Sequence, residues 1–505
     1  MLVLQSIMEN LLAYVQDSLS IIWFYLPIGI IGIWRWTVWI IKKIIGSFYK
    51  VKHNNFNASV SVVIPVYNED PHVFKRALLS WRENKPFEII AVIDYSDVSS
   101  IEIFKEFSKT NMNAHLIVTP KPGKRAALVD GIKVAKGELV ALVDSDTIWT
   151  KDVIKNSLPP FIDPKVAGVT TRQNVLAPKT LAQRLFDIQL DSRYFDEYPF
   201  LGAAGDALVC LSGRTAFYRR EVILPMCHDL EHETFMGRKV ISGDDKRLTY
   251  LVLEQGWKVA YQKNARVFTP GMATMKSYMK QRLRWTRNSL RADSKALVSG
   301  WPFRHPALAF FQIDKVIQSF TLILSPIYFF VSLYYGLYLG AYVIFVWWFV
   351  SRAIKMYPHL RRRPEDIFFL PYYVFFTFFS AILKIYALFT LNTQGWITRW
   401  DTNRLVRLKA FQYVPAWTMT ALVFVLLSTA VLHFKGETNF VFPRDTTSVL
   451  GAKTRILKIT PTPSKTPPNN LFLATQFNEK EWCSKHSFMI YSYNAKDNCS
   501  YISYP

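Results

Sequence analysis

Long apolar segments near both ends of the chain constrain its fold more than any other feature of the sequence. Residues 20–41, SIIWFYLPIGIIGIWRWTVWII, are long enough for a transmembrane helix, which needs about 20 apolar residues. Residues 317–351 are almost uninterrupted apolar and aromatic residues, enough for two connected spans around Pro326 and Gly336. Residues 58–300 lack such segments. The sequence therefore predicts a soluble domain between membrane segments.

Positive charge beside these segments predicts the orientation of the chain. The net charge is +23, from 61 Lys and Arg against 38 Asp and Glu. Basic clusters follow the first and second apolar segments, at Lys42, Lys43, Lys50 and Lys52 and at Arg352, Lys355 and residues 361–363. Such clusters mark cytoplasmic loops. We therefore expect an uncleaved N-terminal anchor, a cytoplasmic catalytic domain and a location in the plasma membrane. No motif indicates that the positive charge serves nucleic-acid binding.

The apolar residues 367–391 do not fit a simple transmembrane span. Arg399, Arg404, Arg407 and Lys409 follow them, so both flanks carry cytoplasmic signatures. We expect an interfacial or re-entrant element, broken near Pro371, followed by an outward span at 412–434. The tail, residues 436–505, has no periodicity and is expected to be loose and extracytoplasmic. Its Cys483 and Cys499 would share an oxidising compartment, where they can pair.

Short apolar segments alternate with helical patterns in the soluble part of the chain. ASVSVVIPVYN, EIIAVID, HLIVT and ELVALVD are typical of buried strands, and VFKRALLSW and KRAALVDGIKVA are typical of helices. This alternation predicts an α/β domain with a mostly parallel, Rossmann-like sheet. Ligands of such sheets bind at the carboxyl ends of the strands. No GxGxxG motif follows a strand, so a dinucleotide-binding domain has no direct support.

Two acids one residue apart follow an apolar segment in VALVDSD, at Asp144 and Asp146. Aspartates after a strand are common turn residues, because the carboxylate bonds its own backbone. Alternatively, both carboxylates bind one Mg²⁺ or Mn²⁺, which prefers oxygen ligands and takes one or two carboxylates together with substrate phosphates. The position at the carboxyl end of a strand favours the metal site.

Other predicted strand ends also supply polar residues. SVVIPVYNED, residues 61–70, includes the first strand, and Asp94 ends the second. In PKPGKRAALVDG, Lys124 and Arg125 begin a helix, which favours a phosphate, although a solvated basic turn is the alternative. Three of the predicted strands thus end in acidic residues, and a helix between them begins with basic residues. This arrangement predicts a site for a nucleotide diphosphate and its metal ion.

Two later motifs suit transfer of a sugar. In SGDDKRLTYLVLEQGW, Asp244 and Asp245 precede an amphipathic helix, where they either cap the helix or supply a general base for a sugar hydroxyl. QRLRW, residues 281–285, lies in a basic amphipathic stretch typical of a helix at the membrane surface. There Arg284 can meet a pyrophosphate and Trp285 can stack on a sugar ring.

The order of these motifs resembles a known signature. Asp94, Asp144-Ser145-Asp146, Gly243-Asp244-Asp245 and Gln281-Arg282-Leu283-Arg284-Trp285 look like the D, DxD, [TG][ED]D and QxxRW motifs of processive family 2 glycosyltransferases. These are the membrane-embedded cellulose, chitin and hyaluronan synthases. The resemblance covers residues 61–400. PVYNEDPHVFKRALLSW, PGKRAALVDG, DSDT, GDDKRLT and GWITR are most similar to hyaluronan synthases and their chitin-oligomer relatives.

The resemblance implies a role for each matching residue. Tyr67, Glu69 and Asp94 are implied to contact the uridine, and Lys124 and Asp144 to hold the diphosphate. Trp396 and Arg399 are implied to close over the nucleotide or to bind it. The implied ligands of Mg²⁺ or Mn²⁺ are Asp146 and Asp144. The implied catalytic residues are Asp245 as base, Asp244 beside it, Arg284 on the departing diphosphate and Trp285 under the acceptor sugar. Gln281 is an implied substrate-binding residue.

The resemblance implies a processive, inverting enzyme with a GT-A domain, whose partners are UDP-sugar donors, the growing polysaccharide and membrane lipids. The expected domains are a membrane anchor (1–55), the catalytic domain (56–270), interfacial helices (271–310), a membrane region (311–435) and the tail. The donors are expected to be UDP-GlcNAc and UDP-GlcA. The alternatives are a polymer made from UDP-GlcNAc alone, another glycan, transfer of single sugars to a lipid-linked acceptor, and a non-catalytic transporter or scaffold.

Two departures from the hyaluronan synthase pattern bear on sugar specificity. CLSGRTAFYRR, residues 210–220, replaces the usual glycine-rich acceptor element. DYSD, residues 94–97, lacks the usual glycine beside the acid.

Overall fold

The computed structural model describes residues 2–393 and 406–437, all within the compact unit Met1–Arg444, and places side chains for residues 21–393 and 413–433. Trp396, Arg399, Cys483 and Cys499 lie outside the described residues, as does the predicted tail from residue 438 onward.

An eight-stranded sheet forms the centre of the soluble domain, in the order β3-β2-β1-β4-β7-β6-β10-β5. Its strands are β1 Val60–Val66, β2 Glu88–Asp94, β3 Ala114–Thr119, β4 Leu139–Val143, β5 Ile148–Trp149, β6 Val166–Val175, β7 Thr215–Arg219 and β10 Lys258–Thr269. A small hairpin joins β8 Thr234–Phe235 to β9 Arg238–Lys239. The four strands predicted from the sequence are confirmed as β1 to β4.

The first four strands are parallel, as predicted, and β1 pairs with β2 on one side and β4 on the other. The chain therefore reverses its direction of strand addition between β1 and β4. In open α/β sheets a crevice forms at this switch point, outside the carboxyl ends of the strands. β7 runs antiparallel to β4 and β6, so the sheet is mixed rather than wholly parallel.

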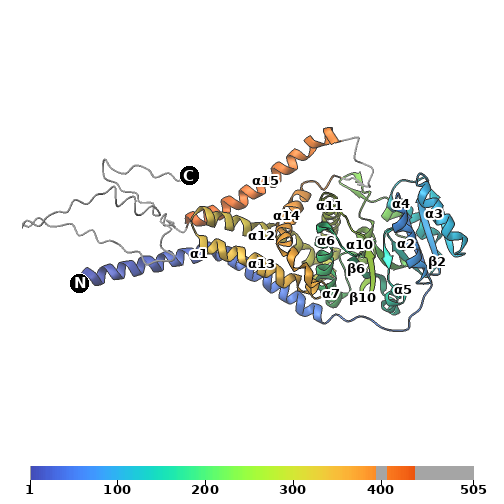
Figure 1. The fold of residues 1–505 in the computed structure, drawn as a ribbon, viewed down its shortest axis with the longest axis horizontal. Helices are drawn as coiled ribbons and strands as arrows, with labels where there is room; N and C mark the ends of the chain where they lie inside the picture. Colours follow the sequence, from blue (N-terminus) through green and yellow to red (C-terminus); the bar gives the residue numbers. More distant parts are fainter. Residues whose placement is uncertain (1, 394–405, 438–505) are drawn as a thin grey trace, which may run out of the picture. The chain divides into compact units, whose positions relative to one another are not determined.

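Helices cover both faces of the sheet (Figure 1). The helices of the soluble part are α2 Pro71–Arg82, α3 Val98–Lys109, α4 Lys124–Val134, α5 Val153–Ser157, α6 Leu181–Ser192, α7 Tyr198–Gly205, α8 Arg220–Ile223, α9 Cys227–Glu231, α10 Asp244–Glu254 and α11 Met275–Ser299. Successive residues of β1 face opposite sides. Val62 belongs to the apolar core with Trp81 of α2 and Phe104 of α3, whereas Val63 belongs to the core with Ile132 of α4.

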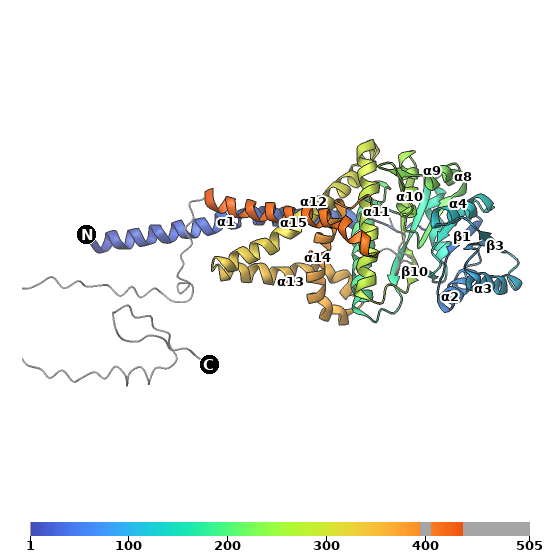
Figure 2. The ribbon, with the colours of Figure 1, turned by 90° about the horizontal axis from the view of Figure 1, so that it is seen from above.

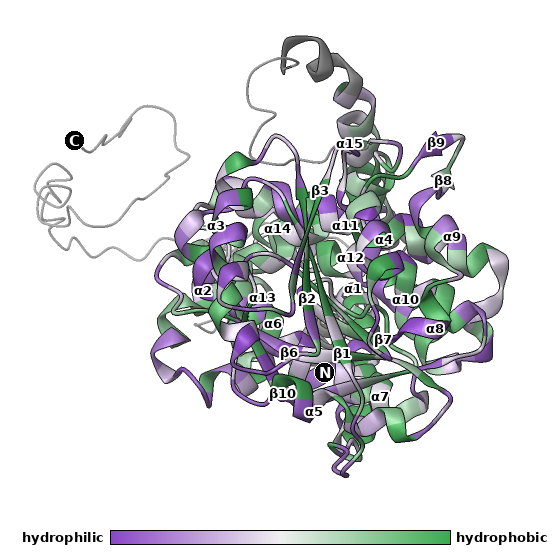
Figure 3. Cartoon of the chain, turned by 90° about the vertical axis from the view of Figure 1, so that its right-hand side faces the viewer, coloured by the Kyte–Doolittle hydropathy of each residue, from purple (hydrophilic) through white to green (hydrophobic). Residues whose placement is uncertain are grey.

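Five helices in the described part of the chain are long and apolar enough to cross a membrane. They lie in α1 Leu2–Ser47, α12 Pro306–Tyr334, α13 Tyr338–Leu360, α14 Leu370–Leu388 and α15 Val406–Glu437. The two connected helices predicted within residues 317–351 are present as α12 and α13, which meet at Gly336 with a φ of 75°. α12 contacts both α1 and α15; α1 and α15 overlap in Figure 2, but Figure 1 shows that they diverge toward the soluble part. Figure 3 shows the central strands of the sheet as mainly hydrophobic.

Charged residues in the second half of α1 face protein. Arg35, which interrupts the first apolar segment, pairs with Asp314 of α12, and Lys42 Nζ lies 2.7 Å from the same carboxylate. Just after α1, Tyr49 stacks on Tyr261 of β10 and donates a 2.7 Å hydrogen bond to its carbonyl oxygen. These contacts fix α1 to both the membrane helices and the sheet.

The segment 367–391 changes its helical type near Pro371, where the 3₁₀ helix Pro364–Phe369 ends and α14 begins at Leu370. α14 is one continuous helix, and Pro371 lies in its first turn, where a missing N–H disrupts no helical hydrogen bond. Both flanks of α14 nevertheless contact elements of the soluble part. Asp366, just before the helix, pairs with Arg184 of α6, and Thr390, just after it, accepts a 2.9 Å hydrogen bond from Arg287 of α11.

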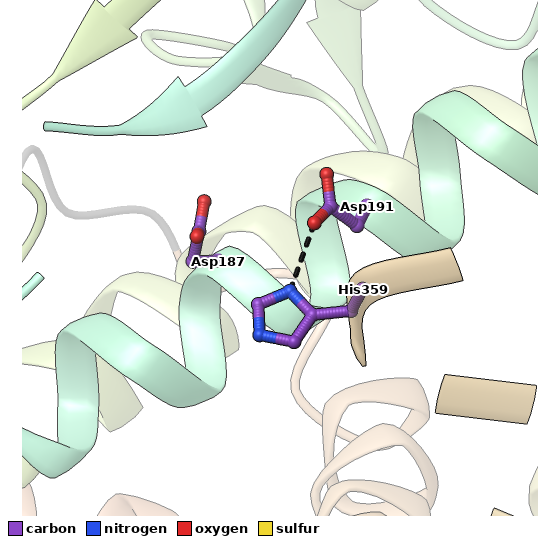
Figure 4. A group of neighbouring side chains, drawn as sticks. All are labelled: Asp187, Asp191 and His359. Carbon is purple, nitrogen blue, oxygen red and sulfur yellow. Dashed lines mark hydrogen bonds and ion pairs between the residues drawn. The ribbon is translucent and has the colours of Figure 1, made fainter. Parts of the chain in front are cut away.

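A buried ionic network joins α6 to the end of α13 and the short 3₁₀ helix Pro364–Phe369. The ring nitrogens of His359 lie 2.8 Å from Asp191 and 2.8 Å from Asp366. Figure 4 shows His359 pointing at the acids of α6. Arg362 pairs with both Asp187 and Asp191. The carboxylates of this cluster pair with arginine or imidazole groups, so the cluster connects α6 to α13 through ion pairs.

Candidate active site

A cavity of about 730 Å³ opens at the switch point of the sheet. Its walls come from the carboxyl ends of β1, β2 and β4, the starts of α4 and α10, one face of α11, and residues of α12 and α14. The cavity therefore extends from the sheet edge to the candidate membrane helices α12 and α14. Apart from Arg125, the predicted site residues within the described ranges all line it: Tyr67, Glu69, Asp94, Lys124, Asp144, Asp146, Asp244, Asp245, Gln281, Arg284 and Trp285.

Lys124 connects two of the predicted motifs. Its ammonium lies 2.6 Å from Asp144 of the DSD motif and 3.0 Å from Asp244 of the GDD motif. Burial lowers the pKa of Lys124, but the charges of Asp144, Asp244 and Asp245 outweigh burial and raise it above its ordinary value. Burial likewise opposes ionisation of Asp244, yet Lys124 holds the pKa of that carboxyl below its usual range. This ion-paired group can exchange partners with an incoming diphosphate.

Gly213 lies where these motifs meet. A Cβ at this position would be 3.1 Å from the Lys124 ammonium and 3.6 Å from an Asp144 oxygen. A side chain here would therefore crowd the ion pair, and glycine leaves the room open. The Gly213 N–H lies 3.4 Å from Asp245 Oδ2.

Asp146 has a different environment from Asp144, although only one residue separates them. Burial and the neighbouring charge of Asp144 raise the pKa of Asp146 to about 6. The Thr269 hydroxyl donates a hydrogen bond to its carboxylate, at 3.2 Å. Asp146 is half-buried, and no cation among the described side chains pairs with it, so its carboxylate is a strong candidate ligand for an added metal ion. Asp144 and Asp146 together supply the hard oxygen atoms that suit Mg²⁺ or Mn²⁺.

Asp245 occupies the first turn of α10 and is half-buried in the cavity wall. Gly243, with a φ of 81°, begins this helix in a left-handed conformation, and a Cβ there would meet Asn288 at 3.1 Å. This tight turn places Asp244 and Asp245 next to α11. Asp245 Oδ1 accepts a 2.8 Å hydrogen bond from the Lys246 N–H, and the carboxylate has access to the cavity. The position suits a base that receives a proton from a bound hydroxyl.

One face of α11 carries the QRLRW motif into the cavity. Gln281, Arg284, Trp285 and Asn288 follow a spacing of three, four and seven residues, so they lie on one side of the helix, and all line the cavity. Burial lowers the pKa of Arg284, partly offset by Asp244 and Asp245. The Trp285 ring packs on Phe186 of α6, with centroids 5.6 Å apart. This packing holds the indole as a fixed platform.

The structure corrects the prediction for Arg125. Only Lys124 of the predicted basic pair lines the cavity. Arg125 is buried, with a guanidinium nitrogen 2.8 Å from Glu233 and 3.0 Å from the Ser242 carbonyl oxygen. It thus supports the segment that leads into the GDD motif rather than a phosphate.

Several cations that line the cavity were not identified from the sequence. They include Arg193, Arg214, Arg282, Lys315 and Lys384. Arg282 lies within QRLRW and Arg214 within CLSGRTAFYRR, so both were adjacent to recognised motifs. Lys315 and Lys384 lie within apolar segments, where an ionisable residue is expected to face protein or a polar cavity rather than lipid. That rule was the available signal for these two lysines.

The chain is similar to several known glycosyltransferases. A protein-family model described as “Glycosyltransferase like family 2” matches residues 57–288. A hyaluronan synthase of Streptococcus pyogenes is 29% identical over 390 residues, covering 74% of this chain and 91% of the relative. An N-acetylglucosaminyltransferase of Rhizobium meliloti is 27% identical over 372 residues, covering 68% and 82%. A solved mannosyltransferase of Pyrobaculum calidifontis, in complex with GDP-Man and Mn²⁺, aligns with a TM-score of 0.41 at 17% identity, covering 84% of this chain and 98% of that one.

The mixed α/β sheet, the acids at its switch point and the matched segment define a glycosyltransferase with a GT-A domain. More particularly, residues 57–288 match the family 2 glycosyltransferase model, and the proteins to which the chain is similar include hyaluronan synthases.

Proposed function

We propose that this chain polymerises UDP-activated sugars processively and passes the polymer across the membrane, as a hyaluronan synthase-like enzyme of the plasma membrane with its catalytic domain in the cytoplasm. The observation that carries this proposal is the single cavity that joins the acids of the sheet edge to α12 and α14. An enzyme that adds one sugar to a soluble acceptor has no need of a site continuous with membrane helices.

The proposed donor site lies at the sheet edge. Tyr67, Glu69 and Asp94 would bind the uridine, where Glu69 is already oriented by a 2.9 Å hydrogen bond from Ser145. Lys124 would leave its carboxylate partners for the diphosphate. Asp144 and Asp146 would hold Mg²⁺ or Mn²⁺, which when bound neutralises charge on the diphosphate. Trp396 and Arg399 remain proposed nucleotide contacts.

The proposed transfer is a single inverting displacement. The acceptor sugar lies on Trp285, and its hydroxyl gives a proton to Asp245 while the oxygen attacks the anomeric carbon. The bond between that carbon and the diphosphate oxygen breaks on the opposite face, and UDP leaves with both bonding electrons. Arg284 and Lys124 stabilise the charge that develops on the departing oxygen.

The end of the cavity near the membrane helices favours an anionic polymer. Its lining includes the cations Arg193, Arg282, Lys315 and Lys384. The lining carboxylate there, Asp293, already receives a 2.7 Å contact from Lys246, and Glu197, 4.0 Å from Lys315, does not line the cavity. A polymer that contains glucuronate would be attracted by this positive lining, whereas a neutral chain of GlcNAc would not.

A second candidate product rests on one of the comparisons. The similarity to an N-acetylglucosaminyltransferase favours UDP-GlcNAc as one donor. A chitin-type product made from UDP-GlcNAc alone is therefore the second candidate.

Release of UDP from single donors and from pairs tests the proposed donors. Purified protein with Mg²⁺ or Mn²⁺ is given UDP-GlcNAc, UDP-GlcA or both. Sustained release only with both donors supports a hyaluronan-type polymer. Sustained release and polymer from UDP-GlcNAc alone would replace it with the chitin-type product, and single-sugar lipid products would contradict polymerisation.

A further inference from the structure

Arg214 lies in the middle of the cavity wall, in the loop that precedes β7. The side chain is buried, with 8% of its surface exposed, yet it lines the cavity. Its guanidinium carbon is 5.4 Å from the Trp285 ring centroid and 5.1 Å from that of Phe186. One guanidinium nitrogen lies 3.2 Å from the side-chain oxygen of Gln173. Two rings and an amide therefore hold the guanidinium beside the proposed sugar platform.

The charge of Arg214 has no acidic partner at bonding distance. Among the side chains that the structure describes, no carboxylate oxygen lies within 4.0 Å of this guanidinium. Arg125, which is similarly buried, has Glu233 at 2.8 Å. A buried cation is costly unless it is paired, so a side chain fixed in this way is suited to receive an anion from outside the chain.

The position of Arg214 indicates which part of the substrate supplies that anion. The diphosphate is assigned to Lys124 and Arg284, which interact with the acids of the sheet edge. The charge of Arg214 also lowers the pKa of Asp146 at the sheet edge, but its guanidinium packs on the ring of Trp285, on which the acceptor sugar is expected to stack. A planar guanidinium binds a carboxylate through two parallel hydrogen bonds, and a glucuronosyl ring carries a carboxylate.

We propose that Arg214 binds the carboxylate of a glucuronosyl unit at the end of the growing chain, while that unit lies on Trp285 and accepts the next sugar. Arg214 thereby makes the acceptor site selective for a uronate-terminated chain. This assignment rests on the proposed function, because it requires a polymer that contains glucuronate. The donor diphosphate is the other possible source of an anion, and the experiment separates the two.

Stalled chains provide the test. Enzyme carrying a nascent chain is supplied with UDP-GlcA alone, which leaves a GlcA end, or with UDP-GlcNAc alone, which leaves a GlcNAc end. The missing donor is then added, and one round of UDP release is timed. We compare wild type, Arg214→Gln, Arg214→Lys and the control Arg76→Gln, an exposed arginine on α2 that does not line the cavity.

For Arg214→Gln we expect addition of GlcNAc to a GlcA end to slow by at least about tenfold, the size expected for loss of a charged hydrogen bond. Addition of GlcA to a GlcNAc end and the affinity for UDP should match Arg76→Gln. Arg214→Lys retains charge but not the planar fork, so an intermediate loss on GlcA ends alone is expected. If Arg214→Gln does not fold, the comparison is made with Arg214→Lys alone.

Three results would overturn the assignment. Equal loss on both chain ends together with weaker UDP binding would identify Arg214 as a diphosphate ligand. Unchanged rates on both ends would make it a structural residue. Failure of the wild type to add GlcA at all would contradict the proposed function itself, and the assignment with it.

Discussion

The acids Asp144 and Asp146 show how far a motif can be interpreted without a structure. Their position after an apolar strand predicted that they would face one site, and both line the cavity. Their different environments were not predictable, because Lys124 and Thr269 reach them from distant segments. The same limitation applies to Arg125. Local sequence indicates a basic residue near a motif but not which side of the chain it faces.

Replacement of the proposed base, Asp245, tests the chemical step. We expect Asp245→Asn to lower the rate of sugar transfer by about 10²–10⁴-fold, the usual contribution of a general base. UDP affinity should be nearly unchanged, because the proposed UDP contacts remain. Asp229→Asn, at an exposed acid outside the cavity, is the control. UDP release at the wild-type rate from Asp245→Asn would exclude this residue as the base.

The half-buried carboxylate of Asp146 should destabilise the metal-free protein. Its pKa in the folded state is raised to about 6, above the value of about 3.9 in an unfolded chain. Stability is therefore greatest below the unfolded pKa and is lost as the pH rises through about 6. Without metal, Asp146→Asn should be more stable than wild type by ~1–3 kcal/mol at pH 8, and by less at pH 5.

Thermal unfolding in detergent at both pH values, with and without Mn²⁺, measures this effect. Mn²⁺ should stabilise the wild type and have little effect on Asp146→Asn. A variant that is less stable than wild type at pH 8 without metal would show that the carboxylate has a structural role instead.

Among the helices, α14 is the one for which hydropathy and charge lead to different interpretations. Hydropathy alone identifies it as a candidate span, whereas the basic residues on both sides predict an interfacial or re-entrant element. The contacts of Asp366 and Thr390 with α6 and α11 favour the second interpretation. The ionic partners of Asp366 could not be predicted, because α6 lies far away in the sequence.

Asp366→Asn tests the attachment of this element. Asp366 is fully buried between Arg184 and His359, so its loss leaves buried cationic or polar groups without their partner. We expect a loss of about 3–5 kcal/mol, the usual effect of breaking a buried ion pair. The adjacent Glu365→Gln, at an exposed acid, should change stability by no more than about 0.5 kcal/mol. Equal effects in denaturant unfolding would contradict a special role for Asp366.

Cysteine labelling tests the orientation of α14. Single cysteines replace the exposed residues Glu365, Asn392 and Tyr334 in a cysteine-free background. An impermeant reagent should label position 334, at the α12–α13 turn, in intact cells, and positions 365 and 392 only after permeabilisation. Labelling of 365 and 392 from opposite sides would mean that α14 crosses the membrane.

For the molecule as a whole, the sequence predicted the half of the sheet with simple apolar strands. β1 to β4 were identified from their apolar patterns, and the parallel arrangement followed from the intervening helices. β6 and β10 were not identified, because polar residues such as Thr170, Gln173 and Gln262 are buried within them. Their partners come from other segments, and such long-range pairing leaves no local pattern.

The cavity that joins the nucleotide end of the sheet to α12 and α14 is the basis for proposing processive synthesis. The sharpest test is the length of the product during the first few turnovers, when purified protein receives both UDP-sugars and Mg²⁺ or Mn²⁺. We predict that long polymer chains are present from the earliest time points, when most enzyme molecules still hold their first polymer. Short products that lengthen together as the reaction proceeds would show that the chain dissociates after each addition, and processive synthesis would then be wrong.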